Sequence, residues 1–520
     1  MTPIAPGETL SSSTLHRQRL VKSLRRADIV FLIVAAVISM DTIGSIAGGG
    51  GQALVWAVVL AGTFLIPYAM VFAETGAAFP QEGGPYQWVK LSFGRGWAGV
   101  ATVMYWITNP IWLGGSLAFI AAKTWSAYVM HIQSGSFADY AFKLAFIWVA
   151  IELAVVSLRT GKRLINAGAV VKVIVLGALP ATAAIYGIEH GFTGLTASSL
   201  SPTTTGFLAI LPVLIFAYVG FEAPSGAAEE MFDAQRDTPP AIRRGSIISM
   251  VAYLVPVLAI VLVTPAGKIT NITGFMSAIA QVYSVYGPAA HALLTITAIA
   301  FVLALVNQGS AWMIATDRMQ AIAAADGAFF SGFFGQFSRR LFTPVRVNIL
   351  SGVTATVFTV AATLIINGSA GAAFGVVLNC AISTLLMSYL IIIPALIKLR
   401  LARADVSRPY RVPGATRGFL VLAGIVLVYI VVGNVAAIFP SALNSALGIG
   451  YSFEQTWGVS GGQFELFTLG TLAVVILLGV VGYLAAGPMR KRAGRTAPSS
   501  TAQLDGVIAS DDIAVDGVES

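Results

Sequence analysis

The sequence predicts an all-α polytopic membrane protein with about 12 transmembrane helices. Of its 520 residues, 57% are hydrophobic and only 10% are charged, whereas a soluble domain carries roughly 25% charged residues. The mean hydropathy is +0.82. Windows of roughly 17–25 apolar residues, the length that crosses a bilayer, recur along the chain, and basic residues gather in every second segment between them.

The apolar windows divide the chain into spans and two polar tails. Residues 1–27 form an N-terminal tail with several basic residues. Residues 489–520 form a C-terminal tail that is polar and then acidic, and it is expected to be disordered. The predicted spans are 29–47, 52–74, 97–122, 142–158, 164–186, 206–228, 246–265, 288–316, 347–366, 371–397, 418–439 and 466–486.

The distribution of charge sets the expected orientation. If the N-terminus lies in the cytoplasm, the cytoplasmic segments hold most of the 31 Lys and Arg residues, and the external segments keep Lys123, Lys143 and Lys268. This asymmetry follows the positive-inside rule, so both termini are predicted to be cytoplasmic. The net charge of +8 therefore lies along a membrane face and does not indicate nucleic-acid binding.

Enzyme and metal chemistry find little support in the sequence. Cys380 is the only cysteine, and the four histidines are scattered without ligand spacing. No zinc-protease motif, nucleotide fingerprint or evident catalytic triad is visible. We therefore predict no catalytic residue, no metal and no cofactor.

The sixth span contains residues that a lipid-facing helix avoids. Residues 211–230 open with apolar side chains and then include Glu222, Pro224 and two glycines. A carboxylate and helix breakers fit a helix that is interrupted part-way across, where freed backbone groups face a cavity. Residues 41–51, DTIGSIAGGGG, interrupt the first span in the matching place. Two such interruptions indicate a binding site for a polar solute.

Several blocks of sequence together resemble the amino acid–polyamine–organocation superfamily of permeases, over roughly residues 27–490. The blocks are FPQEGGPYQWV (79–89), FGRGWAG (93–99), FAYVGFEAPSGAAEE in the sixth span, AWMIATDRMQAIAAADG (311–327) and RPYRVPG (408–414).

The resemblance implies a LeuT-like core of five plus five helices in an inverted repeat, with broken first and sixth helices that flank a central site. The core would cover residues 28–400, with repeats at 28–190 and 206–400, and residues 401–488 would form two additional helices. Many relatives read IGSGIF in the first span, where this chain reads IGSIAGGGG and carries Asp41 just before.

In this fold the break in the first span is expected at Gly44 and Ser45, whose backbone N–H groups would receive a substrate carboxylate. The carbonyl of Ile43 would bind a substrate ammonium group. The sixth span would add carbonyls at its own break, from Ala217, Tyr218, Val219 and Gly220. An alternative for Gly44 and Gly48 is a packing face of small residues.

Asp41 and Glu222 are the carboxylates predicted to act at this site. A carboxylate as deep as Asp41 normally faces a partner or a cavity, so it would bind a cationic group or carry a proton. The alternative for Asp41 is a hydrogen bond to Ser or Thr of a neighbouring helix. Glu222 matches a glutamate position of the family and is predicted to gate or to carry a proton, with capping of the half-helix as the alternative.

Lys172 is the basic residue expected inside a span, the fifth. It aligns with a lysine that, in some proton-coupled relatives, occupies the place that sodium takes in sodium-coupled ones. Burial disfavours the charged form of lysine, so Lys172 is predicted to exchange a proton during transport. The alternative is a permanently charged lysine that ties the fifth span to the first through carbonyls or Asp41.

Three further residues complete the predicted site. Phe216 and Trp312 align with gating aromatics of exchangers in this superfamily, the arginine:agmatine type for both and the glutamate:GABA type for Trp312. Asn109, followed by Pro110, places an amide and a kink in the third span, where relatives line the pocket.

The predicted function is secondary active transport of amino acids or related amines across the cytoplasmic membrane, by alternating access and driven by protons or by exchange. The alternative is a transporter-like sensor that keeps the site and signals through its tails. The expected partners are a small-molecule substrate, membrane lipid and protons. The sequence does not determine the substrate, the choice between symport and antiport, or the oligomeric state.

Overall fold

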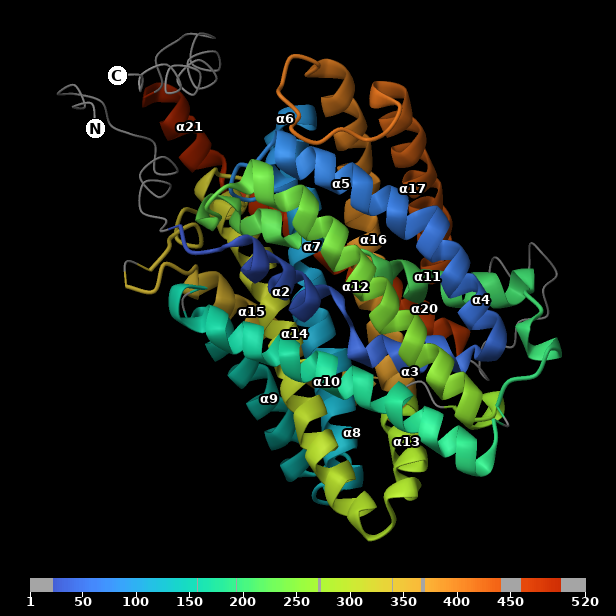
Figure 1. The fold of residues 1–520 in the computed structure, drawn as a ribbon. Helices are drawn as coiled ribbons and strands as arrows, with labels where there is room; N and C mark the ends of the chain where they lie inside the picture. Colours follow the sequence, from blue (N-terminus) through green and yellow to red (C-terminus); the bar gives the residue numbers. More distant parts are fainter. Residues whose placement is uncertain are drawn as a thin grey trace, which may run out of the picture.

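The computed structural model describes residues 22–156, 158–192, 194–269, 273–338, 340–365, 370–440 and 460–496. Within these ranges the chain is almost entirely helical (Figure 1). The described residues contain no β-strand, and their one isolated β-bridge joins Leu24 and Met231. The predicted all-α fold class is confirmed.

The first five predicted spans all fall on helices. The third span continues through a π-helical turn, as the second does. The elements are α2 (Arg26–Val37) and α3 (Met40–Gly48); α4 (Gly50–Leu60), η1 (Ala61–Leu65) and α5 (Ile66–Ala78); α7 (Arg95–Trp112), η2 (Leu113–Leu117) and α8 (Ala118–Tyr128); α9 (Phe137–Val155); and α10 (Leu158–His190).

The remaining spans follow in the predicted order. They are α11 (Thr204–Tyr218) with η4 (Ala223–Glu230), α12 (Ala234–Val263), α14 (Ala290–Ala325), α15 (Val345–Ile365), α16 (Ala370–Ala402), α17 (Ala415–Ile438) and α20 (Gly461–Ala485). Shorter helices connect them or end the described chain, namely α6 (Pro85–Phe93), η3 (Ser198–Leu200), η5 (Ala266–Lys268), α13 (Gly274–Val282), η6 (Tyr283–Ala289) and α21 (Gly487–Thr496).

By length and composition, nine helices of the described chain could cross a membrane, or ten if α2 and α3 form one bent span. The third and fourth predicted spans are not among them. The fourth, α9, carries Asp139, Lys143 and Glu152. The first two of these charges pair with each other at 2.8 Å, which reduces the cost of holding them in a buried helix.

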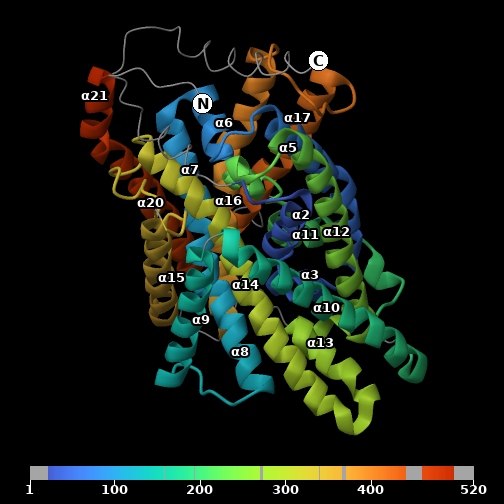
Figure 2. The same cartoon turned by 60° about the vertical axis from the view of Figure 1, so that its left-hand side comes forward.

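The broken first span lies near the middle of the bundle. In both views α2, α3 and α11 are surrounded by longer helices (Figures 1 and 2). Helix α2 packs against α10, α12 and α14, while α11 packs against α3, α4, α16 and α17. The additional helices α17 and α20 both pack against α16. This arrangement removes both interrupted helices from lipid, as their exposed backbone groups require.

The sixth span breaks where the sequence predicts. Helix α11 ends at Tyr218, Val219 is extended, and Gly220 has a φ of +103°. The chain then turns and continues as the short η4 segment from Ala223. The interruption therefore lies within the predicted range.

The break in the first span lies earlier than predicted. Helices α2 and α3 meet at a 48° bend around Ile38 and Ser39, whereas Gly44 and Ser45 are helical. The expected location was wrong because the break is stabilised by side chains from other helices rather than by glycine. Gly44 instead packs against α13, where a Cβ on Gly274 would lie 3.3 Å from the Gly44 Cα.

The two tails are only partly described. Residues 1–21 and 497–520 lie outside the described residues. Helix α21 covers the beginning of the predicted C-terminal tail. At the other end, the backbone N–H groups of Ser23 and Leu24 both donate to the carbonyl of Glu230, so this part of the N-terminal tail packs against the end of η4.

Candidate functional site

The break in the first span is held by Lys172 of α10. Its Nζ donates to the carbonyls of Ala35 at 2.6 Å and Ile38 at 2.7 Å. It also donates to Oε1 of Gln308 in α14 at 3.0 Å. The lysine is fully buried. This geometry matches the tie between the fifth and first spans that the sequence left open as an alternative, and it gives a charged lysine three acceptors.

The N–H groups at the break are also occupied. Ser39 donates its N–H to the hydroxyl of Tyr253 at 2.6 Å, and that hydroxyl donates to the carbonyl of Val37. Met40 donates its N–H to Oε1 of Gln308 at 3.2 Å. A helix begins with N–H groups that lack intrahelical partners, and here other helices of the protein supply the acceptors.

Asp41 is the second residue of α3 and is fully buried. Its Oδ2 accepts from Trp112 Nε1 at 2.8 Å and from Ser116 Oγ at 3.1 Å, and its Oδ1 accepts from Gln308 Nε2 at 3.0 Å. The amide of Gln308 therefore bridges Lys172 and Asp41. Among the described residues, Asp41 has no ion-pair partner within 4.0 Å.

The break in the sixth span exposes the carboxyl end of α11. Gly220 donates its N–H to the hydroxyl of Tyr68 at 3.0 Å instead of to a carbonyl of α11. In the described chain, no hydrogen bond from beyond the helix reaches the carbonyls of residues 215–218. These carbonyls lie at the negative end of the helix dipole and favour a cation.

Glu222 follows the same break and is surrounded by tyrosines. Its carboxylate accepts from the hydroxyls of Tyr105 at 2.6 Å, of Tyr389 at 2.5 Å and of Tyr68. The hydroxyls of Tyr68 and Tyr389 also contact each other at 2.8 Å. No Lys, Arg or His of the described chain forms an ion pair with Glu222. The carboxylate thus has donors but no balancing cation beside it.

Aromatic rings connect the two breaks. We call Tyr105, Trp112, Phe216 and Trp312 the aromatic set. Trp112 lies edge-on to Phe216 at 5.6 Å and to Trp312 at 6.5 Å, and Tyr105 lies 5.9 Å from Trp312 between centroids. A Cβ on Gly220 would lie 2.6 Å from the ring of Trp312. Phe216 and Trp312, predicted from sequence as separate gating residues, are therefore brought together over the sixth-span break.

Asn109 lies on the same face of α7 as Tyr105 and Trp112, because helical neighbours recur every three or four residues. Its Nδ2 donates weakly to the carbonyl of Gly309 at 3.4 Å. Its Oδ1 is buried and has no hydrogen-bond partner. A buried acceptor without a donor costs free energy, so this oxygen is a candidate for contact with a ligand.

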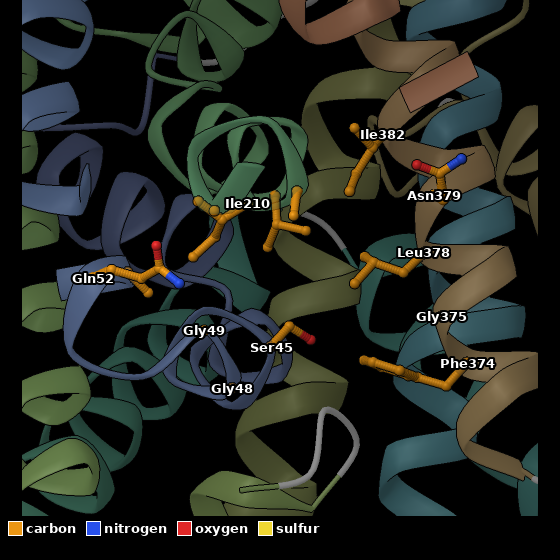
Figure 3. A pocket seen from close by; sticks show the side chains of 14 residues that line it. Ser45, Gly48, Gly49, Gln52, Ile210, Phe374, Gly375, Leu378, Asn379 and Ile382 are labelled. Atoms are coloured by element: carbon orange, nitrogen blue, oxygen red, sulfur yellow. The ribbon is translucent and has the colours of Figure 1, made fainter. Parts of the chain in front are cut away.

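A cavity of about 230 Å³ opens beside α3 and α11 (Figure 3). Ser45 and Gln52 line it from one side, and Phe374, Leu378 and Asn379 of α16 line the other. It reaches Val213, which is one helical turn from Phe216. Ser45 therefore faces this access cavity, although the break in the first span lies elsewhere.

The opposite face is closed by buried charges. Arg318 of α14 is 1% exposed and pairs with Glu230 at 2.7 Å, with Glu82 at 3.9 Å on its other side. The backbone N–H of Glu229 donates to Glu82 Oε2 at 3.0 Å. This cluster and the Leu24–Met231 bridge join the loop after α5, the end of η4, α14 and the chain before α2.

Several site residues could not be chosen from the sequence. Gln308, Tyr253, Tyr68 and Tyr389 are distant in sequence from the motifs they contact, and a glutamine or tyrosine in a span gives no signal by itself. Asp317 lies one residue beyond the predicted span 288–316, whereas the structure places it inside α14 and fully buried. It accepts from Trp106, Ser351 and Asn348.

A sequence model described as "Amino acid permease" matches residues 24–457. Because this match covers most of the chain, the protein belongs to the amino acid permease family. The resemblance to the amino acid–polyamine–organocation superfamily is thereby confirmed, and with it the expectation of a membrane transporter rather than an enzyme.

Three curated relatives each match more than four fifths of this chain. A probable agmatine/putrescine antiporter of Lactococcus lactis is 25% identical over 451 residues, covering 86% of this chain and 93% of the relative. An uncharacterized transporter of Legionella pneumophila is 27% identical over 435 residues, covering 81% and 90%. A methylthioribose transporter of Bacillus subtilis is 24% identical over 449 residues, covering 81% and 90%.

Two solved structures share the fold. The transporter MhsT, solved with L-phenylalanine, has a TM-score of 0.58 at 13% identity and covers 80% of this chain and 99% of its own. A manganese transporter of Eremococcus coleocola has a TM-score of 0.56 at 13% identity, covering 93% and 98%. These likenesses confirm the predicted LeuT-like architecture with broken first and sixth helices.

Proposed function

We propose that this protein is a secondary active transporter of amino acids or related amines that works by alternating access in the cytoplasmic membrane. The observation that carries the proposal is the pair of interrupted helices whose breaks are linked by the aromatic set. Polar backbone groups at two breaks provide a solute site inside a bundle that is otherwise apolar. The cavity on one face and the closed charge cluster on the other are what one end state of such a cycle requires.

The substrate range is supported by the relatives and by the site. The Lactococcus relative carries the name of an agmatine/putrescine antiporter, and the family description is that of amino acid permeases. The free carbonyls of α11 suit an ammonium group, which amino acids and amines share.

Coupling to protons or to a second substrate is part of the proposal. Lys172 and Glu222 are the candidates, because each is a buried ionisable group beside a break. Lys172 donates to the backbone carbonyls of Ala35 and Ile38 at the bend of the first span. A change in the charge of Lys172 would therefore alter the stability of that bend. The choice between symport and antiport follows from measuring flux with and without a pH gradient.

The orientation with both termini in the cytoplasm follows from the distribution of basic residues. In that orientation the charge cluster around Arg318 closes the cytoplasmic side, and the cavity beside Ser45 faces outward. Membrane lipid would contact the exposed apolar side chains of the outer helices.

The test is flux of labelled substrate into liposomes that contain the purified full chain. Candidate substrates are first selected by ligand-induced increases in the melting temperature, since a ligand of the folded state raises it. Transport is expected for at least one compound that stabilises the protein. A compound that binds without crossing the membrane would contradict transport and favour the alternative, a sensor with a transporter fold.

A further inference from the structure

The substrate class can be narrowed by comparing the two halves of the site, which are the amino end of α3 and the carboxyl end of α11. This step rests on the proposed function, since it concerns what the same site binds. An amino acid brings a carboxylate and an ammonium group, and each needs a partner in the protein. In a transporter with broken helices, the amino end of one half-helix offers N–H groups to an anionic group, and the carboxyl end of another offers carbonyls to a cation.

The half that would bind a carboxylate is already filled. The N–H groups of Ser39 and Met40 at the start of α3 donate to Tyr253 and Gln308, and the N–H of Thr42 lies 3.3 Å from the carbonyl of Ser39. Asp41 places its own carboxylate at this positive end of the helix dipole. An entering carboxylate would find the N–H groups of Ser39, Met40 and Thr42 already occupied and would meet the buried carboxyl group of Asp41.

Asp41 is also held firmly in this place. Trp112, Ser116 and Gln308 all donate to it from α7, η2 and α14. Three donors from three elements fix the position of this carboxyl group. The protein therefore places its own carboxyl group where the substrate of an amino acid transporter would bring one.

The half that would bind a cation is open. The carbonyls of residues 215–218 have no partner from beyond α11 among the described residues. Phe216, on the last turn of this helix, contacts Trp112, which in turn contacts Trp312. Aromatic faces attract ammonium groups, so the carboxyl end of α11 combines an electrostatic and an aromatic preference for a cation.

Asn109 adds an acceptor on the face of α7 that carries Tyr105 and Trp112. Its buried Oδ1 has no donor in the protein, and an ammonium group would supply one. Glu222, linked to Tyr105, adds a second buried carboxylate without an adjacent cation. Asn109 and Glu222 thus both favour a ligand that donates hydrogen bonds or carries positive charge.

We infer that the substrate is a cationic amine that carries no α-carboxylate, rather than an α-amino acid. The filled amino end of α3 rejects the carboxylate, and the open carboxyl end of α11 with Asn109 accepts the ammonium group.

The experiment uses pairs of compounds that differ by one carboxylate: agmatine and arginine, putrescine and ornithine, cadaverine and lysine, phenethylamine and phenylalanine. The melting temperature of the full chain in lipid nanodiscs is measured with each compound, and flux is measured in liposomes. In at least one pair, the amine should bind at least tenfold more tightly than its amino acid and should be transported. A site built to reject an unpaired buried charge supports a discrimination of roughly this size.

Two variants test the two halves separately. Asp41→Asn replaces the carboxyl group at the start of α3 with an amide that can donate to a carboxylate, so the amino acid of the best pair should gain affinity relative to the amine. Asn109→Leu removes the free acceptor and should weaken amine binding roughly tenfold, with little change in the melting temperature without ligand. Asn434→Leu is the matched control, because Asn434 also has a buried Oδ1 without a partner but lies on α17.

These measurements test the inferred ligand class and the proposed transport function separately. Amine binding without flux supports the inferred ligand class and contradicts transport. Equal or tighter binding of the amino acid in every pair overturns the inference while leaving transport intact. The inference also fails if none of these compounds binds, or if Asn434→Leu weakens amine binding as much as Asn109→Leu does.

Discussion

Gly220 is the residue on which the break in the sixth span depends. Its φ of +103° lies in the region that side chains disfavour. A Cβ there would also approach the Trp312 ring to 2.6 Å. Two independent constraints therefore require glycine, one from the backbone and one from the aromatic set.

Gly220→Ala is expected to lower the free energy of unfolding by roughly 1–3 kcal/mol, because it combines a strained φ with a steric conflict. Substrate flux should fall more than surface expression does, since the variant displaces Trp312. Thermal unfolding of the purified protein and flux in liposomes check both statements. Gly177→Ala is the control, because a Cβ at that exposed helical position would meet nothing within 4 Å. Equal losses of stability and flux in Gly177→Ala and Gly220→Ala would contradict this role of Gly220.

Lys172 illustrates how one side chain can serve two purposes. Its contacts with Ala35, Ile38 and Gln308 explain how the first span bends without glycine. The same contacts make the bend sensitive to the charge of the lysine, and a charge that responds to conformation is what a coupled cycle needs. Structure and coupling are therefore compatible at this residue.

Lys172→Ala is expected to abolish uptake driven by an inward proton gradient, while exchange of substrate for substrate continues at a reduced rate. Exchange requires no net movement of protons. Both activities are measured in liposomes with and without an imposed pH difference. If the variant still concentrates substrate in response to the gradient, Lys172 has only a structural role, and Glu222 or Asp41 becomes the coupling candidate.

At the scale of elements, the two broken helices differ in how well their sequences reveal them. The sixth span was located correctly because Gly220 itself supplies the conformation that the break needs. The first span was misplaced because its break at Ile38 and Ser39 has no local signal. Its partners are Lys172, Tyr253 and Gln308, which lie far away in sequence. A break stabilised by distant side chains cannot be read from local composition.

The charge cluster around Arg318 is the element that closes one face. Arg318 pairs with Glu230 and lies near Glu82, which also faces Glu229 across reciprocal hydrogen bonds. Burial raises the pKa of Glu82 well above its usual range, and the neighbouring charge of Glu230 raises it further, while Arg318 opposes this shift. The closed face therefore favours a proton on Glu82.

This proton makes the closed face sensitive to pH. Because the pKa of Glu82 is higher in the folded chain than in the unfolded chain, its contribution to stability decreases as pH rises from the usual carboxyl range through the raised pKa. The Glu82→Gln variant keeps an acceptor and cannot ionise. Its melting temperature should therefore fall less than that of the parent protein as the pH rises through this range. Melting curves at a series of pH values for both proteins check this. Glu465→Gln in α20 is the control and should follow the parent protein.

At the scale of the whole molecule, the two faces are unequal. The face that holds Arg26, Glu82 and Arg318 is sealed by ion pairs and by the chain before α2. The other face admits the cavity beside Ser45. The sequence predicted the spans, their order and the family, because these follow from apolar length, charge asymmetry and local motifs. It could not predict which face is open, since that depends on how distant helices pack.

The last prediction tests both the orientation and the open face. Cys380 is the only cysteine and is buried, so Cys380→Ser gives a background for single cysteines. Gln52→Cys places a thiol in the cavity, and Gln235→Cys places one at the start of α12 on the closed face. Both replaced side chains are uncharged, so the charge pattern that sets the orientation is preserved.

In intact cells, a membrane-impermeant maleimide is expected to label Gln52→Cys and to leave Gln235→Cys unmodified. Permeabilising the membrane should make Gln235→Cys reactive, because that exposed position then meets the reagent from the cytoplasmic side. An amine that binds at the carboxyl end of α11 should slow labelling of Gln52→Cys if the cavity closes over it. If Gln235→Cys alone is labelled in intact cells, the orientation is opposite to the proposed one and the sealed face lies outside the cell.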